Sequence, residues 1–151
     1  MKKALGLGVI FALMAGLVMA QQKVKPYSYT FKKGFGTCVF TNVTVEQAWT
    51  AATTVLKHLK WDLTEETNEA SGLMVALSSP SFVQNTPRNY KLSLRFEQNP
   101  NGVKVSAKVE DVWVSGGGNA LYEALFANSG HEHIEKSIYN KMAEALYGKG
   151  K

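Results

Sequence analysis

Cysteine is almost absent from this sequence, because Cys38 is the single one among 151 residues. One cysteine excludes a disulfide framework and any zinc or iron–sulfur site built from several cysteines. Internal repeats, low-complexity linkers and a second long apolar run after residue 20 are also missing. With 45% hydrophobic and 19% charged residues, the composition still indicates a globular chain, and its length fits one domain with its own core.

Motifs of familiar enzymes are missing as well. No nucleophile or metal motif of a common hydrolase class is present. The glycine-rich segment 115–119 lacks the lysine and hydroxyl residue of a P-loop and the glycine spacing of a dinucleotide fingerprint. We interpret it as a hinge or turn; the alternative is an anion held by its backbone amides. We therefore expect no enzyme activity, no cofactor and no bound metal.

The cysteine, the histidine–glutamate pair and the acidic turn are the candidates for catalysis or metal binding. The sequence favours a structural role for each of them. Cys38 lies in an apolar segment with no histidine near it in sequence, which is typical of a small buried hydrophobe. His131 and Glu135 are four residues apart on one helix face and are candidate ligands of a surface metal. Because no further ligand pair is evident, we interpret them as part of a solvated helix start. The acidic turn 65–69 is interpreted as solvated.

The first twenty residues carry the clearest targeting signal. Lys2 and Lys3 form a short basic region, and the run from 4 to 20 has no charge. Small residues precede a polar stretch at Gln21, so the pattern predicts a signal peptide over 1–20, cleaved after residue 20. The alternative is an uncleaved membrane anchor, since the apolar run is near the shortest length that spans a bilayer.

Removal of this leader lowers the net charge. Of 17 basic and 12 acidic side chains, Lys2 and Lys3 would leave with it, so that +5 becomes +3. This balance suits solubility and gives no nucleic-acid footprint. We expect a periplasmic or secreted protein that is soluble after cleavage, binds no nucleic acid and has no stable membrane insertion.

Alternating apolar residues predict short strands along the chain after Gln21. Strands are expected at 27–31, 37–41, 61–64, 73–77, 90–97 and 103–109. The glycines at 34 and 36 are expected to mark a bulge or tight bend between the first two. A loop is expected over 78–89.

Amphipathic helices are expected on both sides of these later strands. Thr44 and Gln47 form a capping box before an apolar face with Trp49 at its centre. In the C-terminal part, a short helix from Asn119 precedes one that ends at Gly148; a single helix over 119–147 is the alternative. A capping box of Ser129 and Glu132 begins the last helix, and its predicted apolar stripe is Ile134, Ile138, Met142, Ala145 and Leu146.

The hairpin formed by 90–97 and 103–109 has a predicted register. The turn Asn99–Gly102 and the charge pattern set Glu97 opposite Lys104 and Lys91 opposite Glu110. This pairing partly neutralises a basic stripe on the outer face of the hairpin, formed by Lys91, Arg95, Lys104 and Lys108. The alternation slips at 110–111, which predicts a bulge or the end of pairing.

The order of the elements predicts an α+β fold. Two amphipathic helices separated by an antiparallel meander need one shared sheet to bury their apolar faces. We expect a two-layer sandwich, with about five antiparallel strands and with the first helix and the C-terminal helices on one face. Residues 21–36 are expected to be an extended N-terminal segment before a single domain over 37–148. Over these residues the element order resembles the helix-grip and TATA-binding-protein-like folds of small exported bacterial domains. That resemblance implies a binding or assembly module.

The loop 78–89 and the late strand carry the candidate contact residues. Apolar side chains on an irregular loop serve as partner contacts, or pack back over the sheet. The candidates are Phe82, Val83, Arg88 and Trp113.

Two hypotheses about function follow. The first is a non-catalytic exported module that contacts another envelope protein or a surface polymer. The second is a small carrier of an apolar ligand held between the sheet and the C-terminal helix, since aromatic residues are concentrated there.

Overall fold

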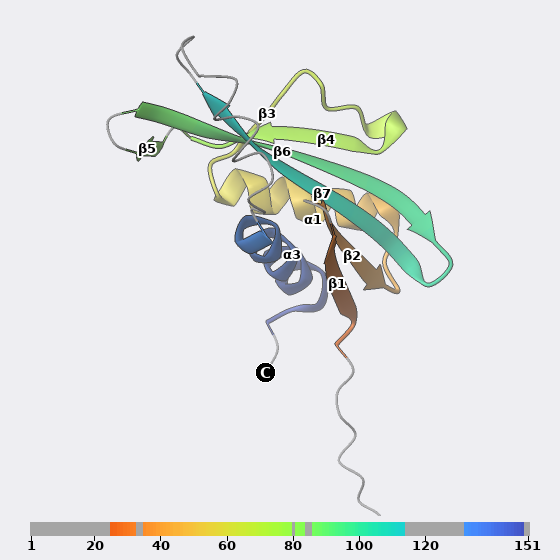
Figure 1. The fold of residues 1–151 in the computed structure, drawn as a ribbon. Helices are drawn as coiled ribbons and strands as arrows, with labels where there is room; N and C mark the ends of the chain where they lie inside the picture. The colour runs from red at the N-terminus through yellow and green to blue at the C-terminus, as the bar shows by residue number, and fades with distance from the viewer. Residues whose placement is uncertain (1–24, 33–34, 80, 84–85, 114–131, 150–151) are drawn as a thin grey trace, which may run out of the picture.

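A computed structural model describes residues 25–32, 35–79, 81–83, 86–113 and 132–149. In these residues two α-helices pack on one antiparallel sheet, which confirms the predicted α+β class (Figure 1). The strands are β1 (Tyr27–Lys32), β2 (Phe35–Thr41), β3 (Asp62–Leu63), β4 (Leu73–Leu77), β5 (Ser81–Val83), β6 (Thr86–Asn99) and β7 (Gly102–Trp113). The helices are α1 (Val45–His58), α3 (Glu132–Tyr147) and the 3-10 turn η1 (Glu69–Ser71).

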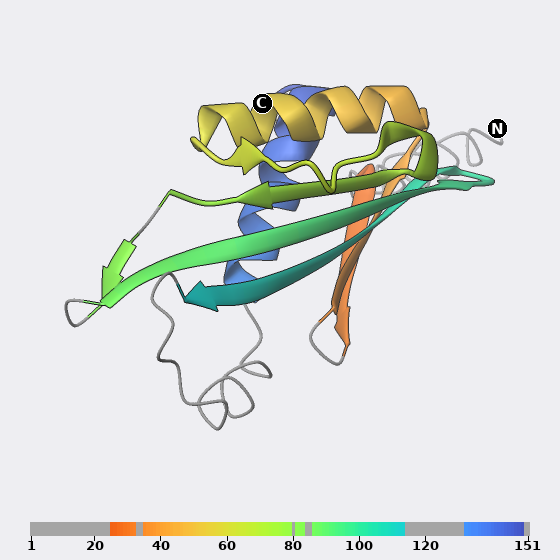
Figure 2. The same ribbon diagram turned by 90° about the horizontal axis from the view of Figure 1, so that it is seen from above.

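Both helices lie on the same face of the sheet, as the view from above shows (Figure 2). The strand order is β1-β2-β7-β6-β4-β3, and β5 pairs with β6. The sheet therefore has seven strands where about five were expected. Several predicted features lie outside the described residues: the signal peptide, the glycine-rich segment, His131, the capping box at Ser129, and the choice between one C-terminal helix and two.

The first two predicted strands are present and pair with each other as a hairpin. β1 and β2 pair antiparallel, with Tyr29 opposite Cys38. β1 is an edge strand of the sheet, although its residues fall in the range expected to be an extended N-terminal segment. Its ring side chains turn toward α3, and the Tyr27 hydroxyl donates to Asn140 Oδ1 at 3.0 Å.

Helix α1 begins with the predicted capping box. Thr44 Oγ1 accepts from the Gln47 N–H at 3.2 Å, and the Gln47 side chain accepts from the Thr44 N–H at 2.9 Å. Trp49 is only half-buried, with its ring 5.2 Å from that of Phe96. The fully packed positions belong to smaller residues, Ala48, Ala51, Ala52, Val55 and Leu56. Trp49 therefore lies at the margin of the stripe, not at its centre.

The central hairpin has the predicted register. Glu97 pairs with Lys104 and Lys91 pairs with Glu110 across β6 and β7. The inward-facing residues of this hairpin are buried, as the alternation predicted: Leu92, Leu94, Phe96, Val105, Ala107 and Val109.

Two predictions near the end of this hairpin are wrong. The expected loop 78–89 contains β5 and the beginning of β6, which pair antiparallel. Pro87 is compatible with this arrangement because it is the second residue of β6, at the beginning of the strand, where its missing N–H interrupts little of the ladder. The expected bulge at 110–111 is absent, since Tyr90 pairs with Asp111 and Asn89 with Val112 in unbroken register. The apolar alternation changes there although the pairing does not.

The last helix ends where the sequence predicts, but the side of it that is buried differs from the predicted apolar stripe. Gly148 adopts a left-handed conformation with φ +81, and its N–H donates to the Glu144 carbonyl at 2.9 Å. The buried residues are Glu135, Ile138, Tyr139, Met142 and Ala143. Ala145, assigned to the stripe from the sequence, is exposed. The stripe is displaced because α3 packs against both α1 and the β1–β2 side of the sheet.

Candidate functional site

The four candidate contact residues belong to one end of the sheet, which we call the distal end: Ser81–Val83 of β5, residues 86–90 of β6 and residues 110–113 of β7. Figure 2 shows β5 and the beginning of β6 lying past the end of α1. Arg88 pairs with Ser81 on one side and with Trp113 on the other. Phe82 pairs with Pro87 one step further along. Facing positions of antiparallel strands lie about 4.5–5.5 Å apart, so positions 88 and 113 share one face of the sheet. Position 82 lies on the opposite face, because successive strand positions alternate between the faces.

The base of the distal end is fixed by backbone hydrogen bonds. The Ser78 N–H donates to the Tyr90 carbonyl, and the Tyr90 N–H donates to Ser78 Oγ, both at 2.9 Å. These bonds hold the chain that leaves β4 against β6. The distal end therefore rests on a defined sheet rather than on an irregular loop.

The basic stripe is largely neutralised by neighbouring carboxylates. Lys104 Nζ lies 2.9 Å from Glu97 Oε2, as the register predicts. Lys91 lies opposite Glu110, but its Nζ contacts Glu66 at 2.7 Å. Lys108 forms an ion pair with Glu110, and of the four stripe cations only Arg95 has no ion pair with a described residue. The stripe therefore presents little net positive charge.

Cys38 is buried in the core. It is 0% exposed and is a free cysteine. Burial raises the pKa of its thiol to about 12. A thiol that stays protonated at neutral pH is a poor nucleophile, which agrees with the structural interpretation of Cys38.

Tyr139 of α3 lies where β2 leaves β7, a point that we call the junction. Gly36 and Ala107 are the last pair between the two strands on this side, while β7 continues to Trp113 beside β6. The single hydroxyl proton of Tyr139 is shared between the Gly36 carbonyl, at 2.7 Å from the hydroxyl oxygen, and the Val105 carbonyl, at 3.0 Å. A helix side chain thus bonds to both strands as they separate.

Glu135 lies one helical turn before Tyr139 at the same junction, and the expectation of a solvated helix start is wrong for this residue. It is 2% exposed. A Cβ on Gly36 would clash with its carboxylate, so the carboxylate lies directly against the glycine backbone. Burial first and then the negative charge of Glu132 raise the pKa of Glu135 to about 7, opposed by a hydrogen bond from the Val109 backbone.

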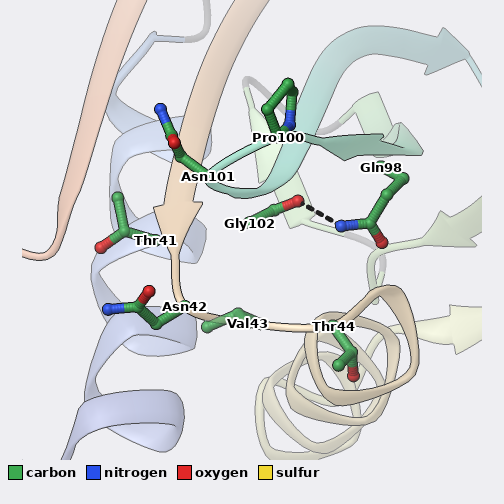
Figure 3. Close-up of a pocket in the computed structure, with 8 residues that line it drawn as sticks. All are labelled: Thr41, Asn42, Val43, Thr44, Gln98, Pro100, Asn101 and Gly102. Atoms are coloured by element: carbon green, nitrogen blue, oxygen red, sulfur yellow. Dashed lines mark hydrogen bonds between the residues drawn. The ribbon is translucent and has the colours of Figure 1, made fainter.

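Two open grooves adjoin the connection between β2 and α1. One, of about 510 Å³, lies at the turn between β6 and β7, where the Gln98 amide donates to the Gly102 carbonyl at 2.8 Å (Figure 3). The other, of about 970 Å³, runs along α1 to the end of α3 and includes Tyr147. Both linings mix uncharged polar and apolar residues, and Glu46 also lines the larger groove. The aromatic residues expected to hold an apolar ligand were Tyr90, Phe96, Tyr122 and Phe126. Of these the structure describes Tyr90 and Phe96, and neither lines either groove.

Neither a metal nor a membrane is indicated by the part of the chain that the structure describes. In those residues no three His, Cys, Asp or Glu side chains gather as metal ligands. No helix in the same residues has both the length and the apolar character needed to cross a membrane. Comparison of the sequence with protein-family models and with curated proteins finds no match.

Proposed function

We propose that this protein is a non-catalytic, exported binding or assembly module that contacts another envelope component through the distal end. The observation that carries the proposal is the pairing of Arg88 with Trp113 on adjacent strands, next to the edge strand β5 that holds Phe82. The signal-peptide pattern supplies the expected location. The partner is another envelope protein or a surface polymer.

The composition of the distal end supports this proposal. Phe, Trp and Arg are the residue types enriched where protein interfaces carry most of their binding energy. Here they lie on paired strands, which restrict backbone movement and lower the entropy lost on binding. The basic stripe is a weaker candidate because neighbouring carboxylates pair three of its four cations.

Site-specific photo-crosslinking in the native envelope tests the proposal. A photoreactive residue at position 82 or 113 is expected to give a defined crosslinked product. The same residue at Lys57, exposed on α1, is the matched control and is expected to give none. The product at 113, the position that pairs with Arg88, should be lost in the Arg88→Glu variant if that variant retains the unfolding midpoint of the wild type.

The crosslinked material also distinguishes the two kinds of partner. A protease-sensitive product of discrete mass indicates a protein, and a protease-resistant heterogeneous product indicates a surface polymer. Equal crosslinking at 57 and 82 would overturn the assignment of the distal end. Saturable binding of an apolar fluorophore that protects Ile138 and Met142 from exchange, without crosslinking at 82, would instead support the ligand-carrier hypothesis.

A further inference from the structure

Glu135 is the single buried Asp, Glu, His, Lys or Arg side chain among the residues whose burial the structure describes. None of the ion pairs between described residues includes it. The Val109 backbone hydrogen bond is the favourable contact that its ionised form makes at the junction. Burying a charge without a counter-ion is costly, and such groups often change protonation state instead.

Among the described residues, the groups that face this carboxyl do not supply a positive charge. On α3 these are Glu132 and Tyr139. On β2, Cys38 lies on the same inward face as Gly36 and acts electrostatically on Tyr139. On β7, Asp111 lies two residues beyond Val109 on the same face. Glu132 adds repulsion, and the tyrosine and cysteine stay neutral at ordinary pH because burial raises the pKa of each.

Lys136, the cation that follows Glu135 in sequence, contacts aromatic rings of β1. Lys136 Nζ lies 5.8 Å from the ring centre of Tyr29 and 5.6 Å from that of Phe31. These cation–π contacts place its ammonium over the outer part of the β1–β2 hairpin. Neighbouring side chains of α3 therefore attach the helix to the hairpin in two ways, one through Lys136 and one through Glu135 and Tyr139.

We propose that the protonation state of Glu135 controls how firmly α3 holds the β1–β2 hairpin at the junction. In the protonated state the carboxyl is a neutral group packed on Gly36, and the contact is closed. In the ionised state a charge that no described cation pairs lies between helix and sheet, and opening of α3 relieves it by admitting water. The helix thus releases the hairpin as the pH rises.

The direction follows from proton linkage. The pKa is about 7 in the closed state and 4.5 when the side chain is solvated, so the closed state binds the proton more tightly. Below pH 4.5 both states are protonated and the carboxyl costs nothing. As the pH rises from 4.5 to 7, ionisation of Glu135 progressively destabilises the closed state. Above pH 7 this destabilisation reaches its full value and changes no further. A difference of 2.5 pKa units corresponds to at most about a 300-fold change in the opening equilibrium.

Hydrogen exchange of the full chain between pH 4.5 and 7.5 is the test. The measured rates are first corrected for the intrinsic pH dependence of amide exchange. In the wild type, the equilibrium constant for opening at β2 and α3 amides is then expected to increase with pH, by at most about 300-fold. In Glu135→Gln, which keeps the shape without the charge, the protection should not change with pH. Glu144→Gln removes an exposed carboxylate from the same helix and should behave as the wild type.

A second variant keeps the proposal testable if Glu135→Gln does not fold. Glu132→Gln removes the like charge at an exposed position, so the midpoint of the transition should move to lower pH. Carbon-13 NMR titration of the Glu135 carboxyl reports the same pKa directly. Titration near 4.5 in the native protein, or wild-type pH dependence in Glu135→Gln, would overturn the proposal. So would an unchanged midpoint in Glu132→Gln.

Discussion

The two halves of the β6–β7 hairpin share one uninterrupted register but differ in what covers them. Beneath the helices, Leu92 and Leu94 are 0% exposed. At the distal end, Tyr90 and Asp111, which pair on the same inward face, are half-buried, although their strands pair as regularly. Backbone pairing therefore extends further than the core does. The alternation of apolar residues therefore indicates which strand positions the helices bury. It does not indicate where the strands end.

Truncation in the covered half is expected to have the largest effect. Leu94→Ala removes a fully buried side chain and should lower the free energy of unfolding by about 2–5 kcal/mol. Val112→Ala at the distal end should cost less than about 1 kcal/mol, because that side chain is partly exposed already. Urea unfolding of both variants measures the difference. Equal losses would mean that a second core covers the distal end.

Trp49→Ala tests the margin of the core. Trp49 is half-buried and contacts Phe96, so its loss should cost about 2–3 kcal/mol, at or below the low end of the range for fully buried aromatic residues. Urea midpoints compared with those of Leu94→Ala decide this ranking. A greater loss for Trp49→Ala would restore the sequence-based view that Trp49 is central to the core.

Gly36→Ala tests the closest contact at the junction. The added methyl group would clash with the Glu135 carboxylate and lie 2.8 Å from Phe31 Cε1, so we expect a loss of about 1–3 kcal/mol by overpacking. In a Glu135→Ala background the same substitution should cost less, because one of the two obstructing groups is gone. Additive effects in this double-mutant cycle would show that the two residues do not interact.

Charge reversal on the outer face should have the smallest effect. Lys104→Glu places like charges opposite each other at Glu97 and should cost about 0.2–1 kcal/mol at low salt. Exchange of both charges, Lys104→Glu with Glu97→Lys, should restore most of that loss. Thermal unfolding at low and high salt checks both variants, and a loss that persists at high salt would contradict an exposed pair.

The features that the sequence predicted well depend on local chemistry. The capping box at Thr44, the helix stop at Gly148 and the register that pairs Glu97 with Lys104 all follow from a few neighbouring residues. The α+β class follows from the order of these elements. Each of these signals acts over a short distance, so one sequence is enough to detect it.

The missed features depend on contacts between distant segments. Glu135 has the charge of a solvated residue, and the sequence does not show that Gly36 leaves room for its carboxylate. One signal was available, because Glu135, Ile138, Tyr139 and Met142 form a stripe at helical spacing. For the candidate site, the sequence identified Phe82 and Trp113 separately. Their placement beside Arg88 required β5 and the unbroken pairing of β7, and neither followed from the periodicity.

The bonds of Tyr147 have a consequence for chain topology. Its hydroxyl donates to the Pro26 carbonyl at 3.2 Å and to the Thr41 carbonyl at 2.8 Å. The beginning of β1 and the end of α3 therefore meet, although 121 positions separate Tyr147 from Pro26. Proteins whose domain ends meet in this way accept circular permutation. A short linker from the end of α3 to β1, with new ends opened in the exposed turn at Pro100, would preserve every strand pair of the sheet.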